Sequence, residues 1–187
     1  MFLLAAAGVA FISVVLTGGR VHRLLALKIR AAWLLMVALA IQILVISVFP
    51  DADRSLLAIM HVASYALAGV VVVLNRAIRG LPTIGFGGLL NAIAIVANGG
   101  TMPASSGALA TAGLTNATGT FENSAALAAP NLSFLGDIFA IPASWPFHNV
   151  FSLGDILIVL GAALLLHFGC GSRVAQSPSA DRLFGWC

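Results

Sequence analysis

The sequence predicts an all-α fold, a helical bundle that crosses a membrane about five times. Charged residues make up only 8% of the 187 residues, against about 25% in a typical soluble domain. Hydrophobic residues make up 60% of the chain, and they gather in charge-free segments of about 18 residues, the length that a membrane helix needs. This composition excludes an ordinary soluble protein. It also excludes a disordered chain, because charge is scarce.

Five apolar segments divide the chain, and each ends at glycine, proline or charged residues. The expected spans are residues 1–17, 31–49, 55–75, 81–98 and 152–169. At about 1.5 Å per helical residue each can cross a hydrocarbon layer of about 30 Å, the first only just. The sequence therefore predicts a single membrane domain over 1–187, with a long loop at 101–151 and a tail at 170–187.

Basic residues predict how these spans are oriented. If the spans alternate in direction, Arg54 falls on one side of the membrane and the other eight of the nine basic residues fall on the opposite side. Lys and Arg next to a span are retained in the cytoplasm. We therefore expect a multi-pass inner (plasma) membrane protein with its N-terminus outside, its C-terminus cytoplasmic and loop 101–151 extracytoplasmic. Topology thus explains the net charge of +3. The predicted partner is the lipid bilayer, and no nucleic acid is expected.

A glycine turn is predicted where the fourth span ends. Asn98 is followed by Gly99 and Gly100, and Pro103 comes three residues later. Paired glycines before a proline typically stop a helix and turn the chain. We expect this turn to lie at the outer surface and to support any site formed there.

Short interfacial or re-entrant helices are expected within the long loop. Residues 104–113 have the composition of a short helix that begins at Ser105 or Ser106 and stops at Gly113. Residues 139–146 combine apolar residues with two prolines and a tryptophan, a composition that suits a segment dipping into the membrane interface and turning back.

A repeated motif singles out two aspartates. Leu-Gly-Asp-Ile occurs at 135–138 and again at 153–156. Asp155 would lie in the first turn of the last span, where the helix dipole stabilises a carboxylate by about 0.3–1 kcal/mol. Alternatively, Asp137 and Asp155 could share a proton and activate a water as general base and general acid. Ser152 and His148 would support such a site, although an interface position suits His148 better.

The chain resembles an uncharacterised family of small bacterial polytopic membrane proteins. The resemblance rests on Asn-Gly-Gly-x-Met-Pro at 98–103 and on the paired Leu-Gly-Asp motifs, the second preceded by Phe151 and Ser152. It covers nearly the whole chain and implies no activity.

A second, partial resemblance concerns residues 135–166. They resemble the C-terminal part of lipoprotein signal peptidase, an aspartic peptidase of the bacterial inner membrane. Ser152 to Asp155 take the place of that family's Asn-x-Ala-Asp motif, and Asp137 matches its partner aspartate. The resemblance implies an aspartic active site on the extracytoplasmic side. The sequence departs from the family at Ser152, which replaces the motif's asparagine, and lacks the family's Asn-x-x-Asp-Arg run.

Three functional hypotheses follow. The first is a non-catalytic subunit of a membrane complex, packed against other membrane-protein subunits through small-residue faces such as Ala66, Gly69 and Gly161. The second is an intramembrane aspartic hydrolase with an Asp137/Asp155 dyad at the extracytoplasmic face. The third is a small-solute transporter. The sequence has no metal-ligand spacing, nucleotide loop or haem motif, so neither a metal nor a cofactor is predicted.

Overall fold

A computed structural model describes residues 2–49, 52–114 and 124–176. The fold is mostly helical, with α1 (Phe2–Leu16), α2 (Trp33–Ile43), α3 (Arg54–Leu74), α4 (Leu81–Ala97), α5 (Ser106–Ala112) and α6 (Leu153–Cys170). A 3-10 helix η1 (Val21–Ala26) precedes α2, a π-helix η2 (Leu44–Val48) extends it, and a 3-10 helix η3 (Ser133–Leu135) lies in the long loop. The predicted tail beyond residue 176 lies outside the described residues.

The fold also contains four short strands, so the all-α prediction is corrected. The strands are β1 (Met102–Pro103), β2 (Ser124–Ala125), β3 (Phe139–Ile141) and β4 (Asn149–Phe151). The first two pair in parallel, and the last two form an antiparallel hairpin. All four lie in the loop between α4 and α6, where backbone groups outside helices need partners and find them in these short ladders.

Each expected span contains one of the long helices, but the structure supports membrane crossing for fewer than five. Two helices, α3 and α6, are long and apolar enough to span a membrane. The apolar segments Ala5–Leu16, Trp33–Val48 and Leu81–Ala97 are shorter. These lengths hint at membrane association.

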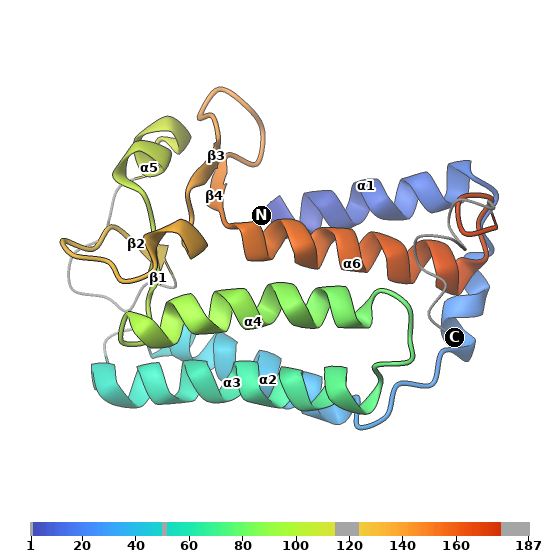
Figure 1. The fold of residues 1–187 in the computed structure, drawn as a ribbon, viewed down its shortest axis with the longest axis horizontal. Helices are drawn as coiled ribbons and strands as arrows, with labels where there is room; N and C mark the ends of the chain where they lie inside the picture. The colour runs from blue at the N-terminus through green and yellow to red at the C-terminus, as the bar shows by residue number, and fades with distance from the viewer. Residues whose placement is uncertain (1, 50–51, 115–123, 177–187) are drawn as a thin grey trace.

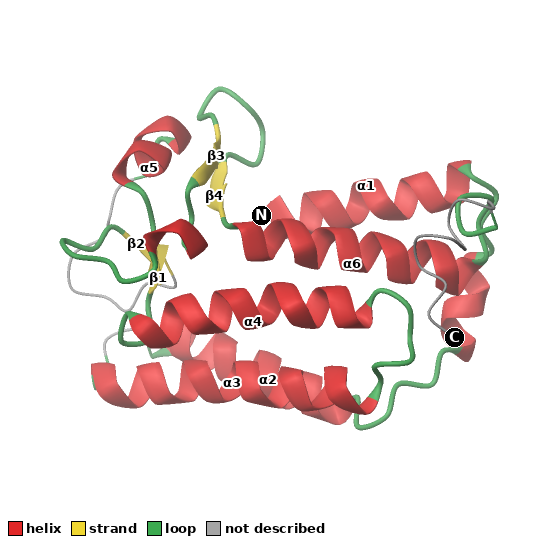
Figure 2. Cartoon of the chain, in the orientation of Figure 1, coloured by secondary structure: helices red, strands yellow, loops and turns green. Residues whose placement is uncertain are grey.

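The five long helices lie side by side; they alternate in direction along the chain, and the neighbours α1 and α6 run the same way (Figure 1). The main contacts join them in the order α2, α3, α4, α6 and α1. The strands and α5 gather at one end of the bundle, and the connection that holds η1 lies at the other (Figure 2). We call the first of these the loop end.

Local sequence signals explain where the two longest helices begin. The Asp53 side chain accepts a hydrogen bond of 2.8 Å from the backbone N–H of Leu56 and so caps α3. Ser152 and Asp155 form a reciprocal capping box at the start of α6. Such caps satisfy N–H groups that the helix itself leaves without partners.

Glycines bring α4 and α6 together along what we call the α4–α6 seam. A Cβ atom on Gly161 would lie 2.6 Å from the backbone nitrogen of Ile84, and one on Gly87 would lie 2.9 Å from that of Ile158. Neither helix could approach the other this closely with a larger residue at those positions.

The loop confirms one expected element and corrects another. Ser105 caps α5, and Gly113 ends it with a φ of 66°, so the short helix is confirmed. The segment expected to be an interfacial or re-entrant helix instead forms the β3–β4 hairpin, and its depth in a membrane stays a prediction. Its strands pair Phe139 with Phe151, whose rings stack with centroids 5.4 Å apart. Cross-strand aromatic packing of this kind stabilises a hairpin.

Candidate functional site

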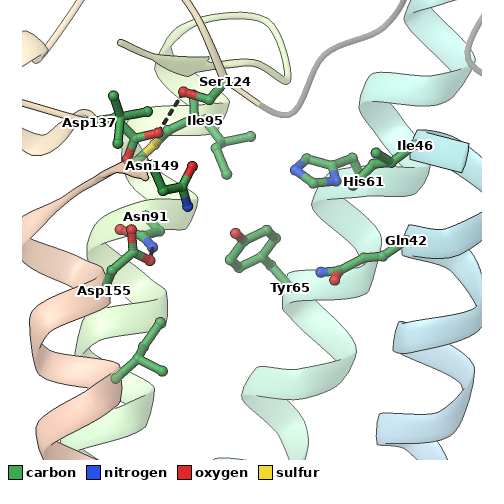
Figure 3. Close-up of a pocket in the computed structure, with 13 residues that line it drawn as sticks. Gln42, Ile46, His61, Tyr65, Asn91, Ile95, Ser124, Asp137, Asn149 and Asp155 are labelled. Carbon is green, nitrogen blue, oxygen red and sulfur yellow. Dashed lines mark hydrogen bonds between the residues drawn. The ribbon is translucent and has the colours of Figure 1, made fainter. Parts of the chain in front are cut away.

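A polar cavity of about 270 Å³ lies at the loop end of the bundle (Figure 3). Residues from α2, α3, α4, α6 and the long loop line it, namely Gln42, Ile46, His61, Tyr65, Asn91, Ile95, Met102, Ser124, Asp137, Asn149, Val150, Asp155 and Ile158. Both aspartates singled out by the sequence therefore face one cavity, on the side opposite Tyr65 and Gln42 (Figure 3).

Asp155 is held by a closed set of hydrogen bonds across the α4–α6 seam. Its Oδ1 accepts from the side-chain amide of Asn91 at 2.9 Å, and its Oδ2 accepts from the backbone N–H of Ser152 at 3.0 Å. The Ser152 hydroxyl donates to the Asn91 carbonyl oxygen at 2.9 Å and accepts from the Asp155 N–H at 3.0 Å. Because both carboxyl oxygens accept hydrogen bonds, the arrangement suits an ionised carboxylate.

Asp137 reaches the cavity from the loop. Its backbone N–H donates to the carbonyl oxygen of Pro103 at 2.9 Å, and its own carbonyl oxygen accepts from the N–H of Ser105 at 3.0 Å. The Ser124 hydroxyl donates to its Oδ2 at 2.5 Å. Backbone pairing thus places this side chain opposite the start of α6.

Burial makes Asp137 easier to protonate than an ordinary carboxyl group. The residue is only 6% exposed. Burial is the main cause that raises its pKa to about 6; the Ser124 hydrogen bond opposes this rise, and the charge of Asp155 adds a smaller one. Desolvation and a nearby like charge both disfavour the ionised form. The two carboxyl groups therefore interact, and burial favours the protonated form of Asp137.

Each Leu-Gly-Asp copy places its aspartate by a close backbone approach at the glycine. A Cβ on Gly136 would lie 3.0 Å from Pro103 Cγ, and one on Gly154 would lie 2.6 Å from Asn91 Cγ. In both copies of the motif, once in the loop and once on α6, the glycine allows the close contact that positions the following aspartate.

The opposite wall of the cavity comes from α2 and α3. The rings of His61 and Tyr65 make an edge-on contact with centroids 5.5 Å apart. Gln42 donates from its side-chain amide to the Ser64 hydroxyl at 3.1 Å. The Gln42–Ser64 bond joins α2 to α3 at this wall.

The supporting residues expected from the sequence occupy different places. Ser152 is buried below the cavity as the cap of α6. Asn98 bonds Asn131, with its carbonyl oxygen accepting from the Asn131 N–H at 2.8 Å, and so anchors the loop. Gly99 and Gly100 form the expected turn with φ of 65° and 94°. None of these lines the cavity, and neither does His148, which is exposed in the hairpin.

Sequence reasoning missed Gln42, Ser124 and Asn149 as cavity residues. Gln42 carried a usable signal, because it is a polar residue inside an otherwise apolar segment. Asn91 bridges α4 to α6 through its bonds to Asp155 and Ser152. Within residues 2–49, 52–114 and 124–176, no group of three or more His, Cys, Asp or Glu could hold a metal ion.

The fold and the cavity define a small, mostly helical protein with an apolar exterior and a polar site at one end. The model of a family of unknown function, DUF5317, matches residues 26–167, so the chain belongs to that family. The match agrees with the expected uncharacterised family and covers α2 to most of α6. No curated protein and no solved structure matches the chain.

Proposed function

We propose that the protein is a multi-pass membrane protein that crosses the bilayer with α1, α2, α3, α4 and α6. The outward faces of these helices support this proposal, because they carry exposed large apolar side chains such as Ile12, Met36, Ile59, Phe86 and Leu160. Within the apolar windows of α3 and α6, only 22% and 17% of the residues are buried. A core helix of a soluble protein would be mostly buried, and exposed apolar surface on this scale needs a lipid or protein cover.

The distribution of charge supports the proposed orientation. The connections at the end opposite the cavity contain basic residues, namely Arg20, Arg23, Lys28, Arg30, Arg76, Arg79 and Arg173. Under the positive-inside rule, that end is cytoplasmic and the cavity opens on the extracytoplasmic side.

Cysteine accessibility tests this topology. Single cysteines would replace His148 or Arg76 in a cysteine-free background. The cysteine at position 148 should react with a membrane-impermeant maleimide in intact cells. The cysteine at position 76 should react only after permeabilisation. The opposite pattern would overturn the orientation.

Within this frame we propose an aspartic hydrolase whose dyad is Asp137 and Asp155. The observation that carries the proposal is that both aspartates line one polar cavity, where the charge of one raises the pKa of the other. Asp155, held as a carboxylate, would take a proton from a water that attacks a substrate carbonyl carbon. Asp137, with a pKa raised to about 6, would donate its proton to the carbonyl oxygen. As the C–N or C–O bond of the resulting tetrahedral intermediate breaks, Asp155 would pass its proton to the leaving group and Asp137 would take one back from the intermediate's hydroxyl group.

Matched Asp→Asn variants test this chemistry. The full chain in non-ionic detergent would be assayed on a panel of fluorogenic amides and esters with heads and acyl chains of varied length. Asp137→Asn and Asp155→Asn should each lower hydrolysis by about 100-fold or more. Asp53→Asn is the control, because Asp53 caps α3 at the same end and does not line the cavity. Wild-type rates in both dyad variants, or no hydrolysis by the wild type, would overturn the proposal.

A second candidate function is that of a non-catalytic subunit of a membrane complex. It is favoured by an apolar groove between α2, α3 and α4, lined in part by Ala66 and Gly69, because small residues let a partner helix approach closely. Co-purification of a membrane protein at fixed stoichiometry, lost on Gly69→Leu, would support it, and purification as a lone chain would count against it. No observation adds to the transporter hypothesis, which stays a prediction of the sequence.

A further inference from the structure

The apolar groove between α2, α3 and α4 is larger than the polar cavity. Its volume is about 560 Å³. Most of the residues that line it are aliphatic or small, including Leu35, Leu39, Val62, Val72, Gly88 and Leu89. A groove of this composition accepts a hydrocarbon chain without leaving polar groups unsatisfied.

The groove and the polar cavity adjoin one another. Gln42, Tyr65 and Ile158 line both. In Figure 3, Gln42 and Tyr65 form the wall that faces Asp155 and Asn91. The cavity and the groove are therefore neighbours, with polar groups at the aspartates and apolar groups between the helices, and we call the two together the compartment. The molecule that fits both parts is an amphiphile.

Charge in the cavity restricts the polar head of such an amphiphile. Two carboxyl groups line the cavity, and none of its described lining residues is Lys or Arg. A phosphate or carboxylate head would lie against like charge in a site partly shielded from water, which is unfavourable. A cationic amine or an amide N–H would instead find acceptors on Asp137, Asp155 and Asn149.

We propose that the compartment binds a single-chain lipid whose head is an amine or an amide, with the head among Asp137, Asp155 and Asn149 and the chain in the groove. The proposal rests on the proposed function, because an amide head is a substrate of the proposed hydrolase and an amine head is the product of its hydrolysis. Phospholipids are disfavoured as ligands because their heads carry phosphate.

Two glycines in the groove provide a test that leaves the bundle intact. A Cβ on Gly69 or on Gly88 would meet no atom within 4 Å, so both face open space. Leucine at position 88 would fill the groove without a clash at its Cβ. Gly8 on α1 is the matched control, because it is also open to 4 Å and lies outside the groove.

Photocrosslinking measures occupancy directly and independently of turnover. The full chain in non-ionic detergent would be incubated with tetradecylamine carrying a mid-chain diazirine, and labelled peptides would be mapped by mass spectrometry. We expect labelling on α3 and α4 well above that on α1. Unlabelled tetradecylamine and N-tetradecylacetamide should compete at least about tenfold better than tetradecyl phosphate. Gly88→Leu should reduce the labelling at least about tenfold, and Gly8→Leu should not change it.

The head position is tested by Asp137→Asn. Removing this carboxyl group should weaken competition by the amine more than competition by the acetamide. Equal labelling of all helices, equal competition by the phosphate, or labelling indifferent to Gly88→Leu would overturn the proposal. Groove labelling without hydrolysis would refute the hydrolase alone, whereas hydrolysis unaffected by Gly88→Leu would refute the lipid site alone. Co-purification of a stoichiometric partner helix that blocks labelling would assign the groove to a protein instead.

Discussion

The α4–α6 seam and the groove between α2, α3 and α4 both contain glycines, but these glycines have opposite effects on packing. In the seam, a Cβ added at Gly161 or Gly87 would collide with the backbone of the neighbouring helix. In the groove, a Cβ added at Gly69 or Gly88 would meet no atom within 4 Å. Glycine thus closes one helix pair and leaves space beside another. Stripes of small residues in a membrane helix therefore do not by themselves distinguish packing from an open site.

Polar residues sharpen the difference between the two regions. Asn91 joins α4 to both Ser152 and Asp155 across the seam. On the groove side, the Gln42 bond to Ser64 joins α2 to α3, and the lining further along is mostly apolar. Hydrogen bonds and close backbone contact therefore hold the seam rigidly together. The polar cavity lies where the seam meets the groove.

The largest expected effect concerns the pH dependence of stability at this junction. Asp137 has its pKa raised from 3.8 to about 6 in the folded protein. Between these values the folded state holds the proton more tightly than the unfolded state, so stability falls as pH rises from about 4 to about 6. The difference of about two units corresponds to at most about 3 kcal/mol. Melting temperatures of the wild type in detergent should fall across this range.

Asp137→Asn provides the control for that slope. The amide cannot ionise, so this part of the pH dependence should disappear, and the variant should melt higher than the wild type at pH 7. An identical slope in the variant and the wild type would show that burial of Asp137 is not what destabilises the protein at neutral pH.

Asn91→Ala should give the next largest loss of stability because it removes the hydrogen bonds across the seam. The substitution removes the side-chain donor to Asp155 and the acceptor from Ser152. Buried groups left without partners cost about 1–3 kcal/mol each, so we expect a loss of about 2 kcal/mol, read as a lower melting temperature. Asn98→Ala, two turns further along α4, serves as a comparison and should cost less because two of its loop bonds are exposed. Equal losses would contradict the special role of Asn91.

Gly161→Ala tests the seam sterically. The new methyl group would lie 2.6 Å from the nitrogen of Ile84, an atom of the helix backbone that cannot turn aside. Overpacking of this kind costs about 1–2 kcal/mol, and the loss should appear in thermal unfolding monitored by circular dichroism. Gly8→Ala, which faces open space, should leave the melting temperature almost unchanged. A neutral Gly161→Ala would mean that the two helices are not in close contact.

The sequence predicted the helices better than it predicted the loop. Apolar length and end signals placed the long helices, because helix caps such as Asp53 and Ser152 act within a few residues of the chain. The loop between α4 and α6 depends on distant partners. Asp137, for example, is fixed by backbone bonds to Pro103 and Ser105, which lie more than thirty residues earlier. No local pattern predicts such pairing. The β3–β4 hairpin is a local pairing, but the prolines and the tryptophan between its strands favoured the re-entrant interpretation instead.

The candidate site was predicted in part for a related reason. A repeat drew attention to Asp137 and Asp155, and the structure brings both to one cavity. Asn98, Gly99 and Gly100 looked equally notable in sequence, yet they shape the turn and do not line the cavity. Which polar residue faces a cavity depends on helix rotation and on neighbours across the bundle, and a single sequence contains neither.

The smallest expected effect on stability is the one that separates seam from groove most sharply. Gly88→Leu places a large side chain on α4, the helix that also forms the seam, but on a side where a Cβ meets no atom within 4 Å. Leucine favours helix more than glycine does by up to about 1 kcal/mol. Thermal unfolding should therefore show a change within about 1 kcal/mol, neutral or stabilising. A loss as large as that of Gly161→Ala would mean that the groove closes in solution and that both faces of α4 are packed alike.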